Sequence, residues 1–233
     1  MLGLLLSILA IVMLVPGVVD LVAGNPDWQI FAVSGAMTLF IGVSLALTSR
    51  TGRANLNVRQ AFVLTSLSWI VLTVFAALPF AFSQLDMSPT DAFFEAMSGI
   101  TTTGATVIVN LDEAPQGLLL WRALLQWLGG IGIIVMALAV LPLLRVGGMQ
   151  LFRMESSDQS EKAMPRAAQV AAAIGIIYLV LTVIWSGALW SAGLSGFDAI
   201  THAMTTIATG GFSTHDASIA HFNSATVDIV ITL

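Results

Sequence analysis

The sequence predicts an all-α integral membrane protein in which two leading transmembrane helices precede a tandem repeat. Of the 233 residues, 57% are hydrophobic and only 9% are charged, whereas a soluble domain carries roughly 25% charged residues. Five stretches contain no charged residue, and each reaches the length of about 20 residues that an α-helix needs to cross a ~30 Å hydrocarbon core. These stretches are residues 1–19, 28–49, 60–85, 123–144 and 167–197.

The first stretch resembles a signal peptide only in its hydrophobicity. It lacks a basic n-region and a small-residue cleavage site before Asp20, so we interpret it as a retained helix. The net charge of −5 argues against nucleic acid as a partner, and the absence of cysteine excludes disulfides and thiolate metal sites.

The basic residues predict the topology. Seven of the eight Lys and Arg residues lie in two connections, one between the second and third stretches and one between the fourth and fifth. The positive-inside rule places both connections in the cytoplasm, so the N-terminus is expected to be cytoplasmic and the acidic connections to face outward. The seven residues are Arg50, Arg53, Arg59, Arg145, Arg153, Lys162 and Arg166.

The connection between residues 85 and 116 is too long and too apolar for a simple turn. Ser88 is expected to be the N-cap of a helix, with Pro89 at its first position and Asp91 three residues after the cap. About eleven helical residues at 1.5 Å each give roughly 16 Å, which is half a bilayer. We therefore expect a re-entrant helix that enters the membrane and returns as extended chain.

This unit recurs further along the chain. Asp198 lies 107 positions after Asp91, and Ser195 precedes it with the spacing that separates Ser88 from Asp91. Between Asp91 and Gly104, seven of fourteen positions are identical to the residues 107 positions later. A long apolar helix precedes each copy and an apolar run follows it. The repeated unit is therefore helix, re-entrant helix, Thr/Gly segment and helix.

The Thr/Gly segments, residues 101–106 and 208–213, indicate a site for a cation. A short helix that ends near the bilayer centre directs the negative end of its dipole there. The segment after it can offer backbone carbonyls and Thr hydroxyls that replace the hydration shell of an ion. Glycine at 104 and 211 permits the required backbone angles. The alternative is that Thr and Gly only let helices pack closely.

Several motifs resemble the Trk/Ktr/HKT potassium transporter superfamily, and within it the TrkH-type membrane subunits of bacteria. The similarity covers essentially the whole chain. The residues that carry it are Ser98-Gly-Ile-Thr-Thr-Thr-Gly-Ala-Thr106, Thr206-Ile-Ala-Thr-Gly-Gly-Phe-Ser-Thr-His-Asp216, Trp121-Arg122, Gln126-Trp-Leu-Gly-Gly-Ile-Gly-Ile-Ile134 and Val146-Gly-Gly-Met-Gln-Leu151.

The resemblance implies four such units around a pseudo-fourfold pore, of which this sequence holds two. It therefore suggests the N-terminal half of a longer polypeptide in the inner membrane, without the gating loop of the family's third unit. It also implies a cytosolic nucleotide-binding regulatory subunit, and we expect a homodimer surrounded by lipid. One departure is Thr209, where such sequences often carry an aliphatic residue. Serine in place of the glycine at 104 is associated in the family with sodium permeation.

The sequence divides into four predicted regions. They are the two leading transmembrane helices (1–55), a first pore unit (56–150) with pore helix 88–100 and filter 101–106, a cytoplasmic loop (151–165), and a second pore unit (166–233) with pore helix 195–207, filter 208–213 and a truncated helix.

Potassium uptake through a carbonyl-lined selectivity filter is the predicted function. The alternatives are a less selective Na⁺/K⁺ permease of the same fold and a fragment that does not transport. An enzyme is not expected. The Thr/Gly segments are expected to lie within the membrane, and no nucleophile–base pair or pair of acidic residues accompanies them there. No organic cofactor and no transition-metal site are expected. The predicted K⁺-binding residues are Thr102, Thr103, Gly104, Thr209, Gly210 and Gly211.

Single polar residues allow narrower predictions. Arg122 is expected to snorkel to the outer interface, although it could set a positive barrier near the pore or pair with Asp112 or Glu113. Glu95 is expected to make a supporting ion pair or hydrogen bond behind the filter, because a bare charge there is costly. The three histidines, His202, His215 and His221, lack the sequence spacing of a metal site.

Overall fold

The computed structural model describes residues 2–48, 58–144 and 160–232, and every regular element within these ranges is a helix. Five helices are long and apolar enough to cross a membrane, and they correspond to the five predicted stretches. In chain order the elements are α1 (Leu2–Ala23), α2 (Trp28–Thr48), α3 (Val58–Ala76), α4 (Leu78–Phe82), α5 (Pro89–Ile100), η2 (Leu111–Glu113), α6 (Gln116–Leu144), α8 (Ser160–Ser191), α9 (Gly196–Ile207), η3 (Ser218–Phe222) and α10 (Ala225–Thr232).

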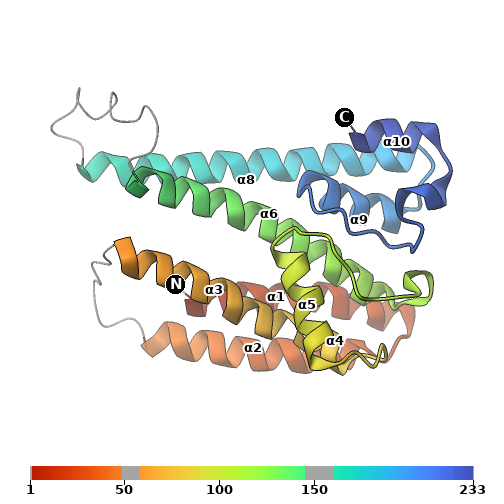
Figure 1. Ribbon diagram of the computed structural model, residues 1–233, viewed down its shortest axis with the longest axis horizontal. Coiled ribbons are helices and arrows are strands. Elements are labelled where there is room, and N and C mark those ends of the chain that lie inside the picture. The colour runs from red at the N-terminus through yellow and green to blue at the C-terminus, as the bar shows by residue number, and fades with distance from the viewer. Residues whose placement is uncertain (1, 49–57, 145–159, 233) are drawn as a thin grey trace.

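Helix α6 is the centre of the described structure, because it contacts α1, α5, α8 and α9. Figure 1 shows the long helices running along the longest axis, with α6 crossing between the α1–α3 group and the pair α8 and α9. The N-terminus lies at the opposite end of α1 from the α1–α2 connection. The two short helices α5 and α9 both pack against α6.

Small residues allow α1 and α2 to pack closely. A Cβ atom at Gly3 would lie 2.5 Å from the carbonyl oxygen of Gly42, and a Cβ at Gly42 would lie 3.0 Å from that of Gly3. Large apolar side chains such as Val22 and Phe40 point outward and are 84% and 75% exposed. Within a bilayer, such side chains would face lipid and small residues would face the neighbouring helix.

The third apolar stretch forms two helices rather than one. Helix α3 ends at Ala76, and α4 begins at Leu78 with Pro79 in its first turn. Proline has no N–H to continue the helical hydrogen-bond series, which accounts for the break. The indole of Trp121 in α6 donates to the carbonyl of Ala76 at 3.0 Å. The carbonyl at the end of α3 is thus used for a contact between α3 and α6.

The start of α6 is held by a buried carboxylate from α1. Asp20 is fully buried, and its Oδ1 accepts a hydrogen bond of 2.7 Å from the backbone N–H of Gly117. The first N–H groups of a helix have no partner within the helix, and the helix dipole favours a negative charge beside them. Asp20 therefore fixes α6 relative to the leading pair of helices.

Of the predicted loop at 151–165, residues 151–159 lie outside the described residues, and residues 160–165 already belong to α8. Arg50, Arg53, Arg145 and Arg153, on which the topology prediction depends, also lie outside them.

We expect Asp20→Ala to lower the free energy of unfolding by about 1–3 kcal/mol, because the buried N–H of Gly117 would lose its acceptor. Asp20→Asn, which keeps an oxygen at the same place, should cost less. The measurement is equilibrium unfolding in mixed micelles, with the exposed Glu113→Ala as the control, expected within about 0.5 kcal/mol of wild type. Equal losses for Asp20→Ala and Glu113→Ala would contradict the assigned contact.

Candidate ion-binding site

The short helices α5 and α9 begin in the same way. Ser88 Oγ accepts a hydrogen bond of 3.2 Å from the N–H of Asp91, and Ser195 Oγ accepts one of 3.0 Å from Asp198. Each serine hydroxyl in turn donates to the carboxylate of the aspartate, at 2.7 Å in both helices. The predicted N-caps are confirmed, and in both helices the aspartate three residues after the cap also binds the hydroxyl of the cap serine.

Both helices also end in the same way. In the first, the N–H groups of Thr102 and Thr103 donate to the carbonyls of Gly99 and Ser98, at 2.9 Å each. In the second, the corresponding bonds run from Thr209 to Thr206 at 2.9 Å and from Gly210 to Thr205 at 2.8 Å. In each of the two bonds, the donor and the acceptor of the second helix lie 107 residues after those of the first helix. The sequence repeat is therefore also a repeat of backbone hydrogen bonds.

The Thr/Gly segments share two left-handed residues each. Thr102 and Thr209 have φ of 55° and 52°, and Gly104 and Gly211 have φ of 78° and 81°. A left-handed conformation costs a non-glycine residue roughly 1–2 kcal/mol, so threonine there marks a constrained site. Successive carbonyls of a regular strand point to opposite sides. Left-handed residues interrupt that alternation and let neighbouring carbonyls turn toward one side.

The two Thr/Gly segments lie against each other. A Cβ atom at Gly104 would collide with the carbonyl oxygen of Gly210, so glycine is required at 104 by space as well as by backbone angle. A Cβ at Gly211, in contrast, would meet no described atom within 4 Å. Of the predicted ligand residues, Thr103, Thr209 and Gly211 are exposed, and Gly210 is buried.

Gln126 of α6 holds the second Thr/Gly segment from behind. Its Nε2 donates to the carbonyl of Gly210 at 2.8 Å, and its Oε1 accepts from the N–H of Phe212 at 3.1 Å. The side-chain amide therefore makes the two backbone hydrogen bonds that a neighbouring β-strand would otherwise make. The Gly210 carbonyl, predicted as a cation ligand, has one lone pair engaged by Gln126. A Cβ at Gly210 would collide with the Gln126 amide.

A buried ion pair lies beneath both segments. Glu95 of α5 and Arg122 of α6 are 0% and 1% exposed, and Arg122 Nε donates to Glu95 Oε1 at 2.8 Å. Glu95 also accepts from the Thr106 hydroxyl at 2.9 Å and from the N–H of Val107 at 3.0 Å. The predicted supporting role of Glu95 is confirmed.

The predicted snorkelling of Arg122 is wrong, because its side chain points inward to Glu95 rather than to the interface. Arg122 Nη1 donates to the carbonyl of Ser213 at 2.7 Å, and the guanidinium lies 4.1 Å from the ring centre of Phe212. The pairing with Asp112 or Glu113 is not observed either. A single arginine therefore connects α5 to the end of the second Thr/Gly segment.

His202 occupies the position in α9 that Glu95 occupies in α5. Its Nδ1 lies 2.8 Å from the carbonyl of Asp198, which can only accept, so Nδ1 carries the proton. Its Nε2 lies 2.9 Å from the hydroxyl of Ser213. This contact corresponds to the one between Glu95 and Thr106. A histidine thus takes the place of the carboxylate in the second unit.

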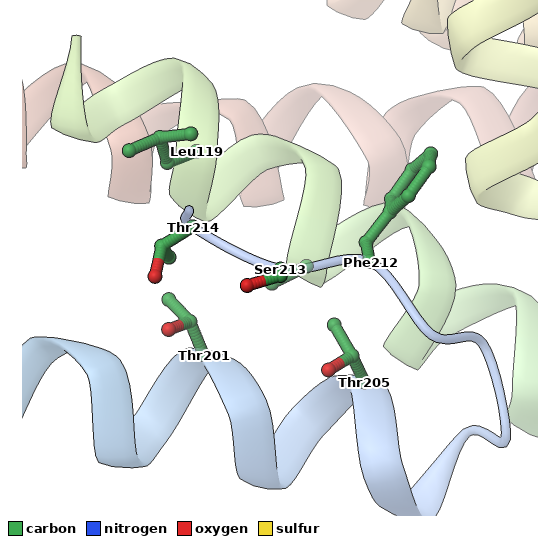
Figure 2. Close-up of a pocket in the computed structure, with 7 residues that line it drawn as sticks. Leu119, Thr201, Thr205, Phe212, Ser213 and Thr214 are labelled. Carbon is green, nitrogen blue, oxygen red and sulfur yellow. The ribbon is translucent and has the colours of Figure 1, made fainter. Parts of the chain in front are cut away.

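The second Thr/Gly segment also packs directly on α9. Burial alone would raise the pKa of Asp198, but hydrogen bonds from Thr214 (2.7 Å) and Ser195 outweigh it and hold the pKa below the ordinary value. Figure 2 shows Thr201 and Thr205 on α9 facing the loop that carries Ser213 and Thr214. The four hydroxyls already have protein partners. The small hollow between them is therefore interpreted as helix–loop packing.

Sequence reasoning missed the roles of Gln126, Arg122 and His202. For Gln126 and Arg122, the signal that could have revealed these roles was the presence of a polar residue in an otherwise apolar helical segment. For His202, the signal was its alignment with Glu95 at the 107-residue offset.

Fold and site together define a class of protein: a helical membrane protein built from repeated units, in which a capped half-length helix ends in a left-handed Thr/Gly segment. The family model TrkH, described as a cation transport protein, matches residues 28–233. The chain belongs to the TrkH family and is a multi-pass membrane protein, which confirms the predicted fold class and the resemblance.

Relatives with curated names include the Trk system potassium uptake protein TrkH of Escherichia coli K12, 45% identical over 99% of this chain and 48% of its own length. The Trk system potassium uptake protein TrkG of the same organism is 36% identical over 99% of this chain and 48% of its own length. The crystal structure of the potassium transporter TrkH from Vibrio parahaemolyticus superposes with a TM-score of 0.87 at 42% identity, covering 98% of this chain and 46% of that one. The chain thus spans about half the length of these relatives.

A double-mutant cycle tests the buried pair. We expect Glu95→Gln and Arg122→Gln each to lower the free energy of unfolding by about 3–5 kcal/mol, because each leaves the other charge buried and unpaired. The double variant should lose clearly less than the sum of the two. Glu113→Gln combined with Arg122→Gln is the matched control and should be additive in the same unfolding assay. Additive losses for Glu95 and Arg122 would contradict the coupling.

Proposed function

We propose that the chain forms part of a pathway for potassium uptake across the cytoplasmic membrane. The observation that carries this proposal is the repeated geometry of the Thr/Gly segments, with left-handed residues at Thr102, Gly104, Thr209 and Gly211. These segments follow the C-terminal ends of α5 and α9, where the helix dipoles favour a cation. Family membership and the names of the relatives support the same substrate.

The proposed ligands are uncharged oxygens. The backbone carbonyls of Thr102, Thr103 and Thr209 would coordinate K⁺, while Gly104 and Gly211 supply the backbone angles that direct them. The Gly210 carbonyl would coordinate K⁺ through its second lone pair, since Gln126 engages only one. Neutral oxygens suit transport because an ion held by a fixed charge would leave slowly. The segments carry no charged side chain between residues 101 and 106 or 208 and 213, which favours transport over catalysis.

The wider arrangement is proposed by family resemblance. Helices α5 and α9 would be re-entrant pore helices, and four units would surround one pore. A cytosolic nucleotide-binding subunit would regulate opening, and two copies of the protein would associate in the lipid bilayer. The split of basic residues supports a cytoplasmic N-terminus and an outward-facing mouth formed by the Thr/Gly segments and the loops after them.

A less selective Na⁺/K⁺ permease is the second candidate, and position 104 distinguishes the two. Glycine at 104 matches the potassium-selective pattern of the resemblance, and a Cβ there would displace the Gly210 carbonyl. A displaced ligand leaves a site that a smaller, partly hydrated ion can use. The glycine therefore favours potassium selectivity.

Gly104→Ser in the full gene product should lower the K⁺/Na⁺ permeability ratio by about tenfold, equivalent to about 1.4 kcal/mol. The ratio is obtained from ion fluxes in proteoliposomes of matched protein content. Gly193→Ser is the control. Gly193 is also left-handed, with φ of 106°, but a Cβ there would have no described atom within 4 Å, and the residue lies outside both segments. An unchanged ratio for Gly104→Ser would remove position 104 from the filter. Absence of potassium flux in the wild-type protein would overturn the function itself.

Cysteine labelling tests the orientation, and the chain has no native cysteine to interfere. We expect Gln116→Cys, at the exposed start of α6, to react with an impermeant thiol reagent in intact cells. Ser157→Cys, in the predicted basic loop, should react only after the membrane is permeabilised. The opposite pattern would invert the topology.

A further inference from the structure

Two histidines that are separate from the Thr/Gly segments in sequence meet an aspartate at one end of the structure. Asp112 lies in η2, His221 in η3, and His215 in the loop that follows the second Thr/Gly segment. One possible ligand atom from each of the three residues lies within 4.8 Å of the other two. The sequence spacing predicted no such cluster, because the aspartate comes from the first unit.

The distances within the cluster are short. Asp112 Oδ1 lies 2.5 Å from His215 Nδ1 and 3.8 Å from His221 Nδ1. The two imidazole rings stack with centres 3.6 Å apart and planes within 6°. Histidine binds metal ions as a neutral imidazole, through whichever ring nitrogen does not carry the proton.

The separations between the ligand atoms are close to those of a zinc site, although the stacked His221 ring has to turn before both imidazoles can point at one ion. Imidazole nitrogen and carboxylate oxygen bind Zn²⁺ at about 2.0–2.2 Å in a tetrahedral arrangement, which separates neighbouring ligand atoms by roughly 3.4 Å. The observed separations of 2.5 and 3.8 Å lie on either side of that value. The His221 side chain is 44% exposed, so its ring is free to turn into place.

The surroundings also fit the second shell of a metal site. A ligating histidine usually directs its other ring nitrogen to a carboxylate or carbonyl, and His215 Nε2 lies 3.4 Å from Asp198 Oδ1. That nitrogen is buried and makes no hydrogen bond within the described residues. The ring of Phe222 lies edge-on to both imidazoles, with centres 5.3 Å apart in each case. Phe222 thus forms an apolar wall on one side of the cluster.

We propose that Asp112, His215 and His221 bind a divalent transition-metal ion of the zinc class. The ion takes the place of the hydrogen between His215 Nδ1 and Asp112. That hydrogen moves to Nε2 of the same ring, which faces Asp198, so His215 binds as a neutral imidazole, and water fills the fourth position. Imidazole ligands favour zinc, copper and nickel over magnesium and calcium. Bound metal would fasten the loop after the first Thr/Gly segment to the loop after the second. The binding itself does not depend on potassium transport.

The test is zinc binding by the purified chain, without a polyhistidine tag, in competition with a chromophoric chelator. We expect one Zn²⁺ per chain, and at least a tenfold weaker affinity in Asp112→Asn and in His221→Gln. Glu113→Gln, next to Asp112 but outside the cluster, is the matched control and should bind within about twofold of wild type.

Cobalt provides an independent readout, since Co²⁺ in the site should show the intense visible bands of tetrahedral coordination, and His221→Gln should abolish them. His221 is half-exposed, so this variant remains informative even if Asp112→Asn fails to fold. The proposal is overturned if the wild-type chain binds no zinc at micromolar concentration, or if His221→Gln binds as tightly as wild type.

Discussion

The ion pair between Glu95 and Arg122 is buried beneath both Thr/Gly segments, and burying two charges costs several kcal/mol per ion before any contact is made. That cost is reduced when the other donors and acceptors of the pair also find partners. Glu95 finds them at Thr106 and Val107, and Arg122 Nη1 finds one at Ser213, whereas Arg122 Nη2 makes no hydrogen bond within the described residues. These partners belong to different units. The pair is therefore more favourable when both segments are in place, which couples the folding of the two units.

The same coupling stabilises backbone that would not persist alone. Threonine in the left-handed region is unfavourable, and the structure contains it at Thr102 and Thr209. Each is fixed on one side by hydrogen bonds to the end of its short helix. The second segment is fixed on its other side by Gln126, whose amide bonds to residues 210 and 212. In the proposed function, carbonyls held in this way would need little rearrangement when an ion binds, which would lower the cost of binding.

Local patterns in the sequence were sufficient for much of the fold. Charge-free stretches predicted the five long helices, and Ser88 and Ser195 predicted where the short ones begin. The internal repeat predicted that the two segments would be alike, although it did not predict that they would touch. Contacts between distant residues were not accessible in this way. Arg122 was assigned to the interface because nothing local indicates that Glu95, 27 residues earlier, lies beneath it. Asp112 and His215 are 103 residues apart and meet only through the packing of the two units.

The second unit has His202 where the first has Glu95, and its helix α10 also lacks an equivalent of Arg122. Helix α10 follows the second Thr/Gly segment as α6 follows the first, but its residues 225–232 include no arginine. A carboxylate at position 202 would therefore have no basic partner from α10, and the histidine that stands there has none from it either. The copies are consequently no longer interchangeable. The first unit contains the buried ion pair, and its arginine also binds the second unit at the carbonyl of Ser213. Exchanging the two units would therefore leave the second Thr/Gly segment without this support.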